Sequence, residues 1–205
     1  MTAREATAAI VLAGGASSRF GGDKLAADLD GRPLLHHALA AVDAVAATLV
    51  LVLAPGGAMP SLPALRGRLV VARDAAAHQG PLAGLAAGLA ALPPGTESAV
   101  VVGGDMPSLV PAVLRLLLDA LEDPEPAAAT LAADPTAVLP MGVRPIVVGA
   151  AAAELLAEGR RALRAVLVRV PSVVVPAAAW RAVDPEGRTL RDVDTRGDLS
   201  GGSTR

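Results

Sequence analysis

The run Ala8-Ala-Ile-Val-Leu-Ala13 leads directly into Gly14-Gly-Ala-Ser-Ser-Arg-Phe-Gly-Gly-Asp-Lys24, and the architecture can be worked out from these two pieces. The first piece is short, apolar and uncharged, which is typical of a strand buried on both faces of a sheet. The second is rich in glycine and ends on a cation. Open α/β sheets bind their ligands in loops at the carboxyl ends of parallel strands, so this loop is a candidate site.

The same alternation continues along the chain. Further apolar runs bounded by Gly or Pro predict strands at 48–54, 69–72, 99–102, 127–131, 143–148 and 173–175. Helical patterns lie at 33–45, 81–92, 111–122, 150–158 and 161–169. Strands that alternate with helices predict an α/β fold of three layers, Rossmann-like, with a mostly parallel central sheet and helices on both faces.

Length and composition set the domain organisation. The chain has 205 residues, without a shift in composition along it, so we expect one domain over residues 1–199. The residues 200–205, Ser-Gly-Gly-Ser-Thr-Arg, predict a disordered tail. Hydrophobic residues make up 53% and charged residues 19%, which excludes a disordered protein.

Composition also excludes several classes of partner and chemistry. A net charge of −2 without a strongly basic stretch argues against nucleic acid, and an aromatic content of 1% leaves few rings for stacking bases. The absence of cysteine excludes disulfides, thiolate metal sites and cysteine nucleophiles. The uncharged stretches 44–65 and 75–96 contain several prolines, so neither predicts a membrane span. We expect no signal peptide and a cytoplasmic location.

The glycine-rich loop has the parts of a phosphate cradle. Glycines let backbone N–H groups approach an anion, Ser17 adds a hydroxyl, Arg19 adds a planar guanidinium, and Lys24 adds a point charge. Lys24 is also the one lysine among 18 Lys and Arg residues. The loop matches neither the P-loop nor the dinucleotide pattern, since Asp23 precedes the lysine and the first two glycines are adjacent. An ordinary glycine-rich turn is the alternative.

At these residues the chain resembles a known family. Residues 12–24 are similar to the pattern L-A-G-G-x-S-x-R-M-G-x-x-K of GT-A-like nucleotidyltransferases, with Phe20 in place of Met. Within that class the chain resembles the molybdenum cofactor guanylyltransferases, or MobA-like proteins, over residues 10–199. Three segments carry this narrower resemblance: 80–84 to G-P-L-A-G, 104–107 to C-D-[MT]-P, and 192–199 to D-[IV]-N-T-P-E-D-L.

The resemblance implies transfer of GMP from GTP to the terminal phosphate of molybdopterin, with release of pyrophosphate and with Mg²⁺ as cofactor. It implies GTP and molybdopterin, or the molybdenum cofactor, as partners, together with cofactor-delivery or cofactor-accepting enzymes. Two alternatives stay open. One is a nucleotidyltransferase with another base or acceptor, such as cytidylyl transfer to molybdopterin or transfer to a sugar phosphate. The other is a non-catalytic nucleotide- or cofactor-binding protein on the same fold.

The resemblance also implies a set of site residues. Catalysis would fall to Lys24, Arg19 and Asp105, and Asp105 would bind the metal, as a carboxylate at the end of a strand is placed to do. Nucleotide contacts are implied for Leu12, Ala13, Gly14, Gly15, Ser17, Lys24, Asp74, Gly80, Pro81 and Asp105. We place Asp194 on the acceptor side. The alternatives are a turn-stabilising role for Asp105, a solvated loop acid for Asp74 and a helix cap for Asp194.

Two departures from the family pattern affect these expectations. The family commonly has an Asn after the second strand that contacts the nucleotide, but this chain has no Asn and reads Leu53-Ala-Pro-Gly56 there. Asp194 stands where the family usually has Asn. Backbone groups would have to replace the contact that the missing Asn makes with the nucleotide. The change from Asn to Asp at position 194 concerns recognition of the acceptor.

Overall fold

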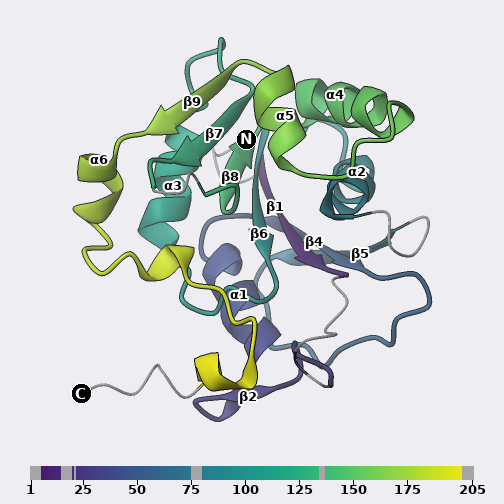
Figure 1. The fold of residues 1–205 in the computed structure, drawn as a ribbon, viewed down its shortest axis with the longest axis vertical. Coiled ribbons are helices and arrows are strands. Elements are labelled where there is room, and N and C mark those ends of the chain that lie inside the picture. Colours follow the sequence, from purple (N-terminus) through teal and green to yellow (C-terminus); the bar gives the residue numbers. More distant parts are fainter. Residues whose placement is uncertain (1–5, 15–19, 21, 75–79, 134–136, 200–205) are drawn as a thin grey trace.

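A computed structural model describes residues 6–14, 20, 22–74, 80–133 and 137–199. Its centre is a sheet of seven strands in the order β5-β4-β1-β6-β8-β7-β9 (Figure 1). These strands are β1 (Thr7–Ala13), β4 (Thr48–Leu53), β5 (Arg68–Arg73), β6 (Ser98–Gly103), β7 (Ala128–Leu131), β8 (Met141–Val143) and β9 (Ser172–Val175). A separate two-stranded sheet pairs β2 (Asp28–Leu29) with β3 (Arg32–Pro33).

The helices connect these strands. They are α1 (Leu34–Asp43), α2 (Pro81–Ala90), α3 (Pro111–Asp119), α4 (Pro145–Ala157), α5 (Arg164–Arg169) and α6 (Ala177–Arg181). Two short 3-10 helices follow, η1 (Arg188–Leu190) and η2 (Arg196–Leu199). Pro occupies the first turn of α2, α3 and α4, where its missing N–H costs no intrahelical hydrogen bond.

The expectation of a mostly parallel sheet is confirmed. β1 pairs in parallel with β4 and β6, β4 with β5, and β7 with β9, whereas β8 runs antiparallel to both β6 and β7. The chain leaves β1 for β4 and β5 on one side and then returns to β6 on the other side. The strand order therefore reverses at β1, and a crevice for ligands is expected at the carboxyl ends of β1 and β6.

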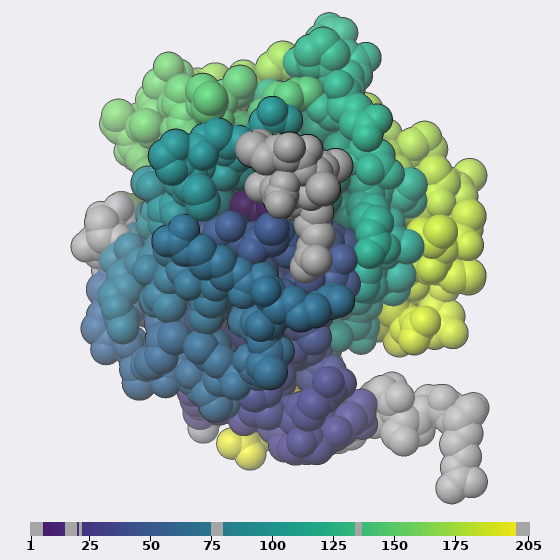
Figure 2. Space-filling model, turned by 180° about the vertical axis from the view of Figure 1, so that it is seen from behind, coloured from purple at the N-terminus to yellow at the C-terminus, as the bar shows by residue number. Residues whose placement is uncertain are grey.

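The two faces of the sheet carry separate helix layers, as the three-layer expectation requires. Ala8 and Ile10 pack in one apolar cluster with α2, α4 and α5, while Ala9 and Val11 pack in another with α1 and α3. All four side chains are at most 1% exposed, which explains why the strand is apolar at each of these positions. Figure 2 shows the molecule from behind, with the connection from β4 to β5 in blue and α4 in green above it.

Helix α2 lies very close to this sheet. A Cβ on Gly88 would approach Cγ2 of Val52 to 3.0 Å, and Ile10 closer still. A side chain at this position would therefore push the helix away from β1 and β4. Glycine at position 88 thus lets α2 pack closely against the sheet.

The predicted strand at 143–148 is wrong. β8 ends at Val143, and α4 begins at Pro145 rather than at residue 150. The apolar run Ile146-Val-Val148 has the composition of a strand, but the preceding proline has a fixed φ that suits the first turn of a helix. The expected tail 200–205 lies outside the described residues, and the division into one domain over 1–199 stays a prediction.

The segment that leads to the C-terminal end of the chain is anchored by a buried carboxylate. Asp184 is 0% exposed, and its oxygens accept hydrogen bonds from the backbone N–H groups of Arg188 at 3.0 Å and Thr189 at 2.8 Å. The Thr189 hydroxyl in turn accepts from the N–H of Val110 at the start of α3, at 3.1 Å. Burial raises the pKa of Asp184, but the hydrogen bonds from Thr189 and Arg188 and the charge of Arg188 outweigh it and lower the pKa.

We expect Asp184→Asn to lower the free energy of unfolding by about 1–3 kcal/mol at pH 7, because an amide cannot accept both hydrogen bonds as a carboxylate does. Since the folded-state pKa is below the unfolded value, the carboxylate stabilises the fold above about pH 3.9 and loses this effect as the pH falls through the folded-state pKa. Urea unfolding at pH 7 and at about pH 3 measures the difference. A difference of equal size at both pH values would contradict the assignment.

Candidate active site

The carboxyl ends of β1 and β6 bring the glycine-rich loop next to the turn that carries Asp105. The N–H of Gly104 donates to the carbonyl O of Leu12 at 2.9 Å, which fixes the two strand ends to each other. A Cβ on Gly103 would collide with Oδ1 of Asp105, so glycine is required for the carboxylate to fold back over the strand end. The structure thus places the end of β1 at Leu12 beside the turn that carries Asp105.

Lys24 is directed into this crevice by its neighbours. The carboxylate of Asp23 accepts hydrogen bonds from the N–H groups of Leu25 at 3.1 Å and Ala26 at 3.3 Å, a turn that orients the lysine between them. The carbonyl O of Leu25 accepts from the N–H of Leu35 at 3.1 Å, so the turn is attached to the start of α1. The position of the lysine side chain is therefore set by backbone contacts on both sides.

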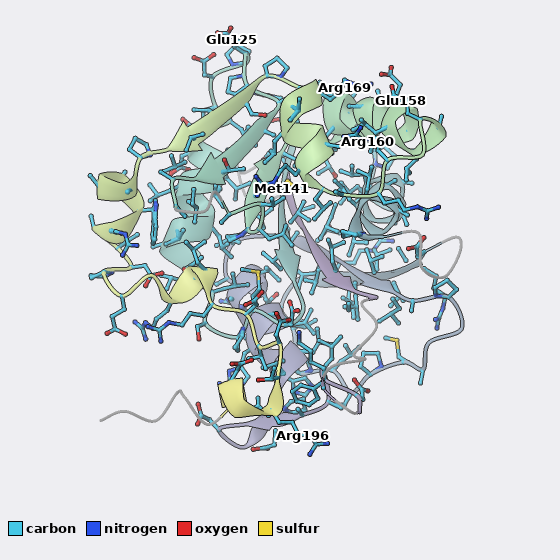
Figure 3. The ribbon with its side chains drawn as sticks, in the orientation of Figure 1. Glu125, Met141, Glu158, Arg160, Arg169 and Arg196 are labelled. Atoms are coloured by element: carbon cyan, nitrogen blue, oxygen red, sulfur yellow. The ribbon has the colours of Figure 1, made fainter. Side chains whose placement is uncertain are left out.

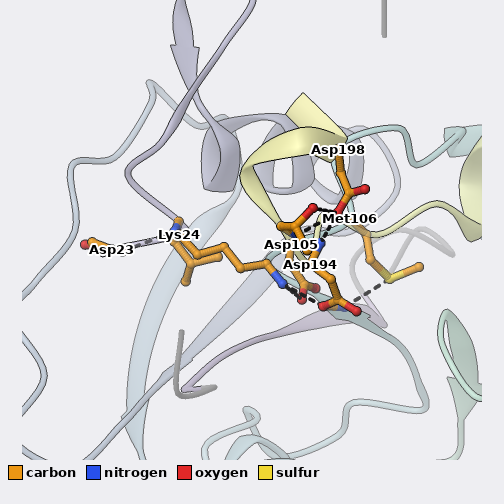
Figure 4. Close-up of polar contacts among 9 residues, drawn as sticks. Asp23, Lys24, Asp105, Met106, Asp194 and Asp198 are labelled. Carbon is orange, nitrogen blue, oxygen red and sulfur yellow. Dashed lines mark hydrogen bonds and ion pairs between the residues drawn. The ribbon is translucent and has the colours of Figure 1, made fainter. Parts of the chain in front are cut away.

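An ion-pair cluster forms around the lysine (Figure 4). Nζ of Lys24 donates to Oδ2 of Asp105 at 2.9 Å and to Oδ1 of Asp194 at 3.1 Å. Lys24 is only 9% exposed, whereas the side chains of Asp105 and Asp194 are 33% and 58% exposed. The ammonium is thus largely buried beneath two carboxylates that face solvent and could meet a ligand.

Negative charge exceeds positive charge in this cluster. Burial lowers the pKa of Lys24, but the hydrogen bonds and charges of Asp105 and Asp194 outweigh it and raise the pKa above its ordinary value. Burial and the charges of Asp194 and Asp105 raise the pKa of the nearby Asp192. Three carboxylates around one ammonium leave room electrostatically for a further cation.

The described residues fit a divalent ion shared with a substrate. No group of three or more His, Cys, Asp or Glu among them converges to hold a metal ion by itself. Mg²⁺ is usually bound by one or two carboxylates together with substrate phosphates, and Asp105 and Asp194 supply two exposed carboxylates.

A cavity of about 900 Å³ opens beside Asp105. Its polar lining consists of Asp105, Asp192, Arg161 and Arg164, and most of its remaining wall is apolar, from Pro81, Met106, the stretch 137–139 and Leu190. The sequence interpretation missed both arginines. The signal for them was present in Gly159-Arg-Arg-Ala-Leu-Arg164, where basic residues follow a helix end marked by glycine.

The start of α2 is attached to the backbone of Arg161, which precedes α5. Gly80 has a φ of +81°, and a Cβ there would lie 2.9 Å from the carbonyl O of Arg161. The N–H of Leu82 donates to that same carbonyl O at 3.1 Å, and the N–H of Ala83 donates to Gly80 at 3.2 Å. These two N–H groups are therefore occupied within the protein, and the helix start is fixed to the wall of the cavity.

Asp74 lies apart from the cavity of Asp105. It follows β5 and lines a second groove of about 520 Å³ along the outer side of α2, with Arg73, Leu156 and several alanines. Among the described residues, no group donates a hydrogen bond to its buried Oδ1. A buried carboxylate oxygen favours having a donor, so this oxygen is suited to accept a further hydrogen bond.

The loop after β4, where the family's Asn would stand, is held by an arginine. Nη1 of Arg73 donates to the carbonyl oxygens of Ala54 at 3.2 Å and Gly57 at 2.8 Å. Gly14 contacts this loop closely, since a Cβ on it would lie 3.1 Å from the backbone N of Ala54. This loop is thus held by contacts to its backbone groups, in the place where the family pattern has Asn.

The carboxylates of Asp194 and Asp198 make different contacts. Oδ2 of Asp198, not Asp194, caps the last short helix, and it accepts hydrogen bonds from the N–H groups of Asp194 at 3.0 Å and Thr195 at 2.6 Å. Asp194 directs its own carboxylate to Lys24. Of the other predicted site residues, Ala13 ends β1, while Gly15, Ser17 and Arg19 lie outside the described residues.

Across the described ranges, none of the helices has the length and apolar character needed to cross a membrane.

Comparison of the sequence with known proteins identifies its family. The family model of the MobA-like NTP transferase domain matches residues 9–173. A protein of Chloroflexus aggregans named "Probable molybdenum cofactor guanylyltransferase" is 31% identical over 199 residues, which cover 93% of this chain and 90% of that protein.

Two solved structures show the same fold. Molybdopterin-guanine dinucleotide biosynthesis protein A from Archaeoglobus fulgidus has a TM-score of 0.75 at 22% identity and covers 94% of this chain and 95% of its own. The 2-C-methyl-D-erythritol 4-phosphate cytidylyltransferase from Thermus thermophilus has a TM-score of 0.67 at 18% identity and covers 93% and 94%. Likenesses at this identity concern the fold alone, and the family follows from the sequence matches: the chain is a nucleotidyltransferase that belongs to the MobA-like NTP transferase family.

Proposed function

We propose that the protein transfers GMP from GTP to the terminal phosphate of molybdopterin and releases pyrophosphate. The observation that carries this proposal is the ammonium of Lys24, held by Asp105 and Asp194 where the strand order reverses, beside a cavity of about 900 Å³. The name of the 31% identical relative supports the choice of base and acceptor.

The reaction needs no protein nucleophile. A phosphate oxygen of the acceptor attacks the α-phosphorus of GTP in line, the bond from that phosphorus to the bridging oxygen of the β-phosphate breaks, and pyrophosphate leaves with the electron pair. Catalysis then consists of positioning and of neutralising charge in the transition state. Lys24 would donate from Nζ to the phosphate oxygens on which charge builds up. Arg19 would add a second cation from the same loop.

Asp105 and Asp194 would hold Mg²⁺ at the edge of the cavity. When bound, the ion would neutralise triphosphate oxygens and help pyrophosphate to leave. Their carboxylates are exposed enough to bind it and are otherwise occupied only by Lys24 among the described residues.

The acceptor would occupy the cavity between Asp105 and Arg164. Its mostly apolar wall suits a flat ring system such as a pterin, and Arg161 and Arg164 bring positive charge toward the phosphate end. The nucleotide would lie on the other side of β1, along Leu12–Gly15 with the hydroxyl of Ser17. Asp74 would accept a hydrogen bond from the base or ribose through its unpartnered Oδ1.

Release of pyrophosphate, measured for each nucleoside triphosphate with molybdopterin as acceptor, tests the function and the base together. We expect GTP to be used at least about tenfold better than CTP, because a polar edge left unpaired on the wrong base costs on the order of 1–3 kcal/mol per group. The fold does not decide this point, since a cytidylyltransferase shares it. A preference for CTP would favour cytidylyl transfer, and binding without pyrophosphate release would favour a non-catalytic protein.

Asp194→Asn tests the acceptor side. The amide keeps a hydrogen-bonding oxygen but removes one of the two charges that hold Nζ of Lys24. We expect the KM for the acceptor to change by about threefold or more, with the Kd for metal-free GTP nearly unchanged, as for the loss of one exposed charged contact. A change in thermal stability alone, with both substrates unaffected, would assign the residue a structural role.

The protein partners and the cytoplasmic location stay predictions.

A further inference from the structure

The segment 193–199 packs against Phe20, near the end of the glycine-rich loop. Val193 packs with Phe20 and Leu34 in a small apolar cluster, in which they are 4%, 4% and 0% exposed. The N–H of Val193 also donates to the carbonyl O of Asp105 at 3.0 Å. One segment thus joins the loop, the start of α1 and the turn that carries the catalytic carboxylate.

Arg196 makes the contact between this segment and the loop. Its Nε donates to the carbonyl O of Phe20 at 3.3 Å, and its guanidinium carbon lies 5.5 Å from the centroid of the Phe20 ring. Its Nη2 lies 3.6 Å from where a Cβ on Gly22 would stand. Figure 3 shows Arg196 at the lower edge of the molecule, beside η2.

This arginine is held by the loop and not by an acid. No carboxylate among the described residues forms an ion pair with its guanidinium, in contrast to Arg169, which pairs with Glu154 and Glu158. Both partners of the contact also depart from the family pattern quoted above, which has Met at position 20 and Pro at position 196. Met at position 20 has no aromatic ring and Pro at position 196 has no charge, so the family's residues could not form this cation–π contact.

We propose that Arg196 is a positioning residue: it fixes Phe20 and thereby holds Lys24, four residues further along, where Nζ meets the triphosphate. The short stretch from Phe20 to Lys24 has its far end fixed by the Asp23 turn. Arg196 fixes its near end, so the backbone that leads into Lys24 is held at both ends. The proposal rests on the proposed function in taking the triphosphate as the ligand.

The test compares Arg196→Ala with Arg181→Ala. Arg181 is a matched control, because it is also exposed and its guanidinium carbon lies 4.6 Å from the centroid of a tryptophan ring, that of Trp180 on α6. We expect Arg196→Ala to raise the Kd for Mg²⁺–GTP about 3- to 10-fold by calorimetry, as for the loss of one exposed cation–π contact and one hydrogen bond. The kcat at saturating GTP should change less, and Arg181→Ala should leave both values unchanged.

Hydrogen exchange in the absence of nucleotide gives a readout that does not depend on the reaction. In Arg196→Ala we expect faster exchange in a peptide that covers 20–27, with no change in β4, and with partial recovery in Arg196→Lys, which keeps the charge over the ring. Unchanged exchange at 20–27 would overturn the proposal, whatever happens to the Kd. If the wild-type protein does not bind GTP, the proposed function fails, while the exchange result still decides whether Arg196 holds the loop.

Discussion

Lys24→Ala is expected to lower turnover by about 10²–10³-fold, the scale for removing one preorganised donor to a transition-state oxyanion. Lys24 is the single lysine of the chain, is 9% exposed and contacts both Asp105 and Asp194. Its loss also leaves two carboxylates facing the phosphates without the cation that neutralises them. Initial rates of pyrophosphate release at saturating GTP and acceptor measure the effect.

Two further variants separate charge from shape at this position. Lys24→Met keeps much of the side-chain length without the charge and should be as slow as Lys24→Ala. Lys24→Arg should restore only part of the activity, because a planar guanidinium does not replace a point charge in a confined site. Circular dichroism and urea unfolding show whether each variant is folded. A folded Lys24→Ala protein that turns over at the wild-type rate would disprove the role of the loop as a phosphate cradle.

Asp105→Asn is expected to remove most of the activity, by a factor on the order of 10²–10³, since an amide oxygen is a much weaker ligand for Mg²⁺ and a weaker partner for the ammonium of Lys24. The two side chains are nearly isosteric. The carbonyl O of Asp105 would still accept the hydrogen bond from Val193, because that bond involves the backbone. The melting temperature should therefore change little.

The accompanying measurement is the metal dependence of the wild-type reaction. We expect the activity to vanish with a chelator and to return with added Mg²⁺, and Asp105→Asn to need a higher Mg²⁺ concentration for half-maximal rate. Asp123→Asn is the matched control, because that carboxylate accepts a hydrogen bond from the N–H of Glu125 in an exposed loop and does not contact Lys24. An Asp105→Asn protein that melts early but keeps full activity would assign this carboxylate to stabilising its turn.

How far the sequence predicts this protein depends on the range of the interactions involved. The strand before the glycine-rich loop and the helices that begin at proline follow from neighbouring residues, and the structure confirms the layers and the strand direction. The apolar run 146–148 does not assign itself, because a short apolar run suits a strand and a helix equally well. Pro145 favours the start of a helix there, and the packing of α4 with α2 in one apolar cluster stabilises it.

The local sequence therefore determines which groups the loop contains: glycines, whose backbone N–H groups can approach an anion, and a lysine at their end. The partners of that lysine are decided only by the tertiary structure, because Asp105 and Asp194 lie 81 and 170 residues away along the chain. The same is true of the arginines on the cavity wall and of Arg196 over Phe20, which is 176 residues distant. Periodicity and loop composition show which groups lie near one another along the chain. The pairing of charges that are distant in sequence depends on how the C-terminal segment packs at the carboxyl ends of β1 and β6.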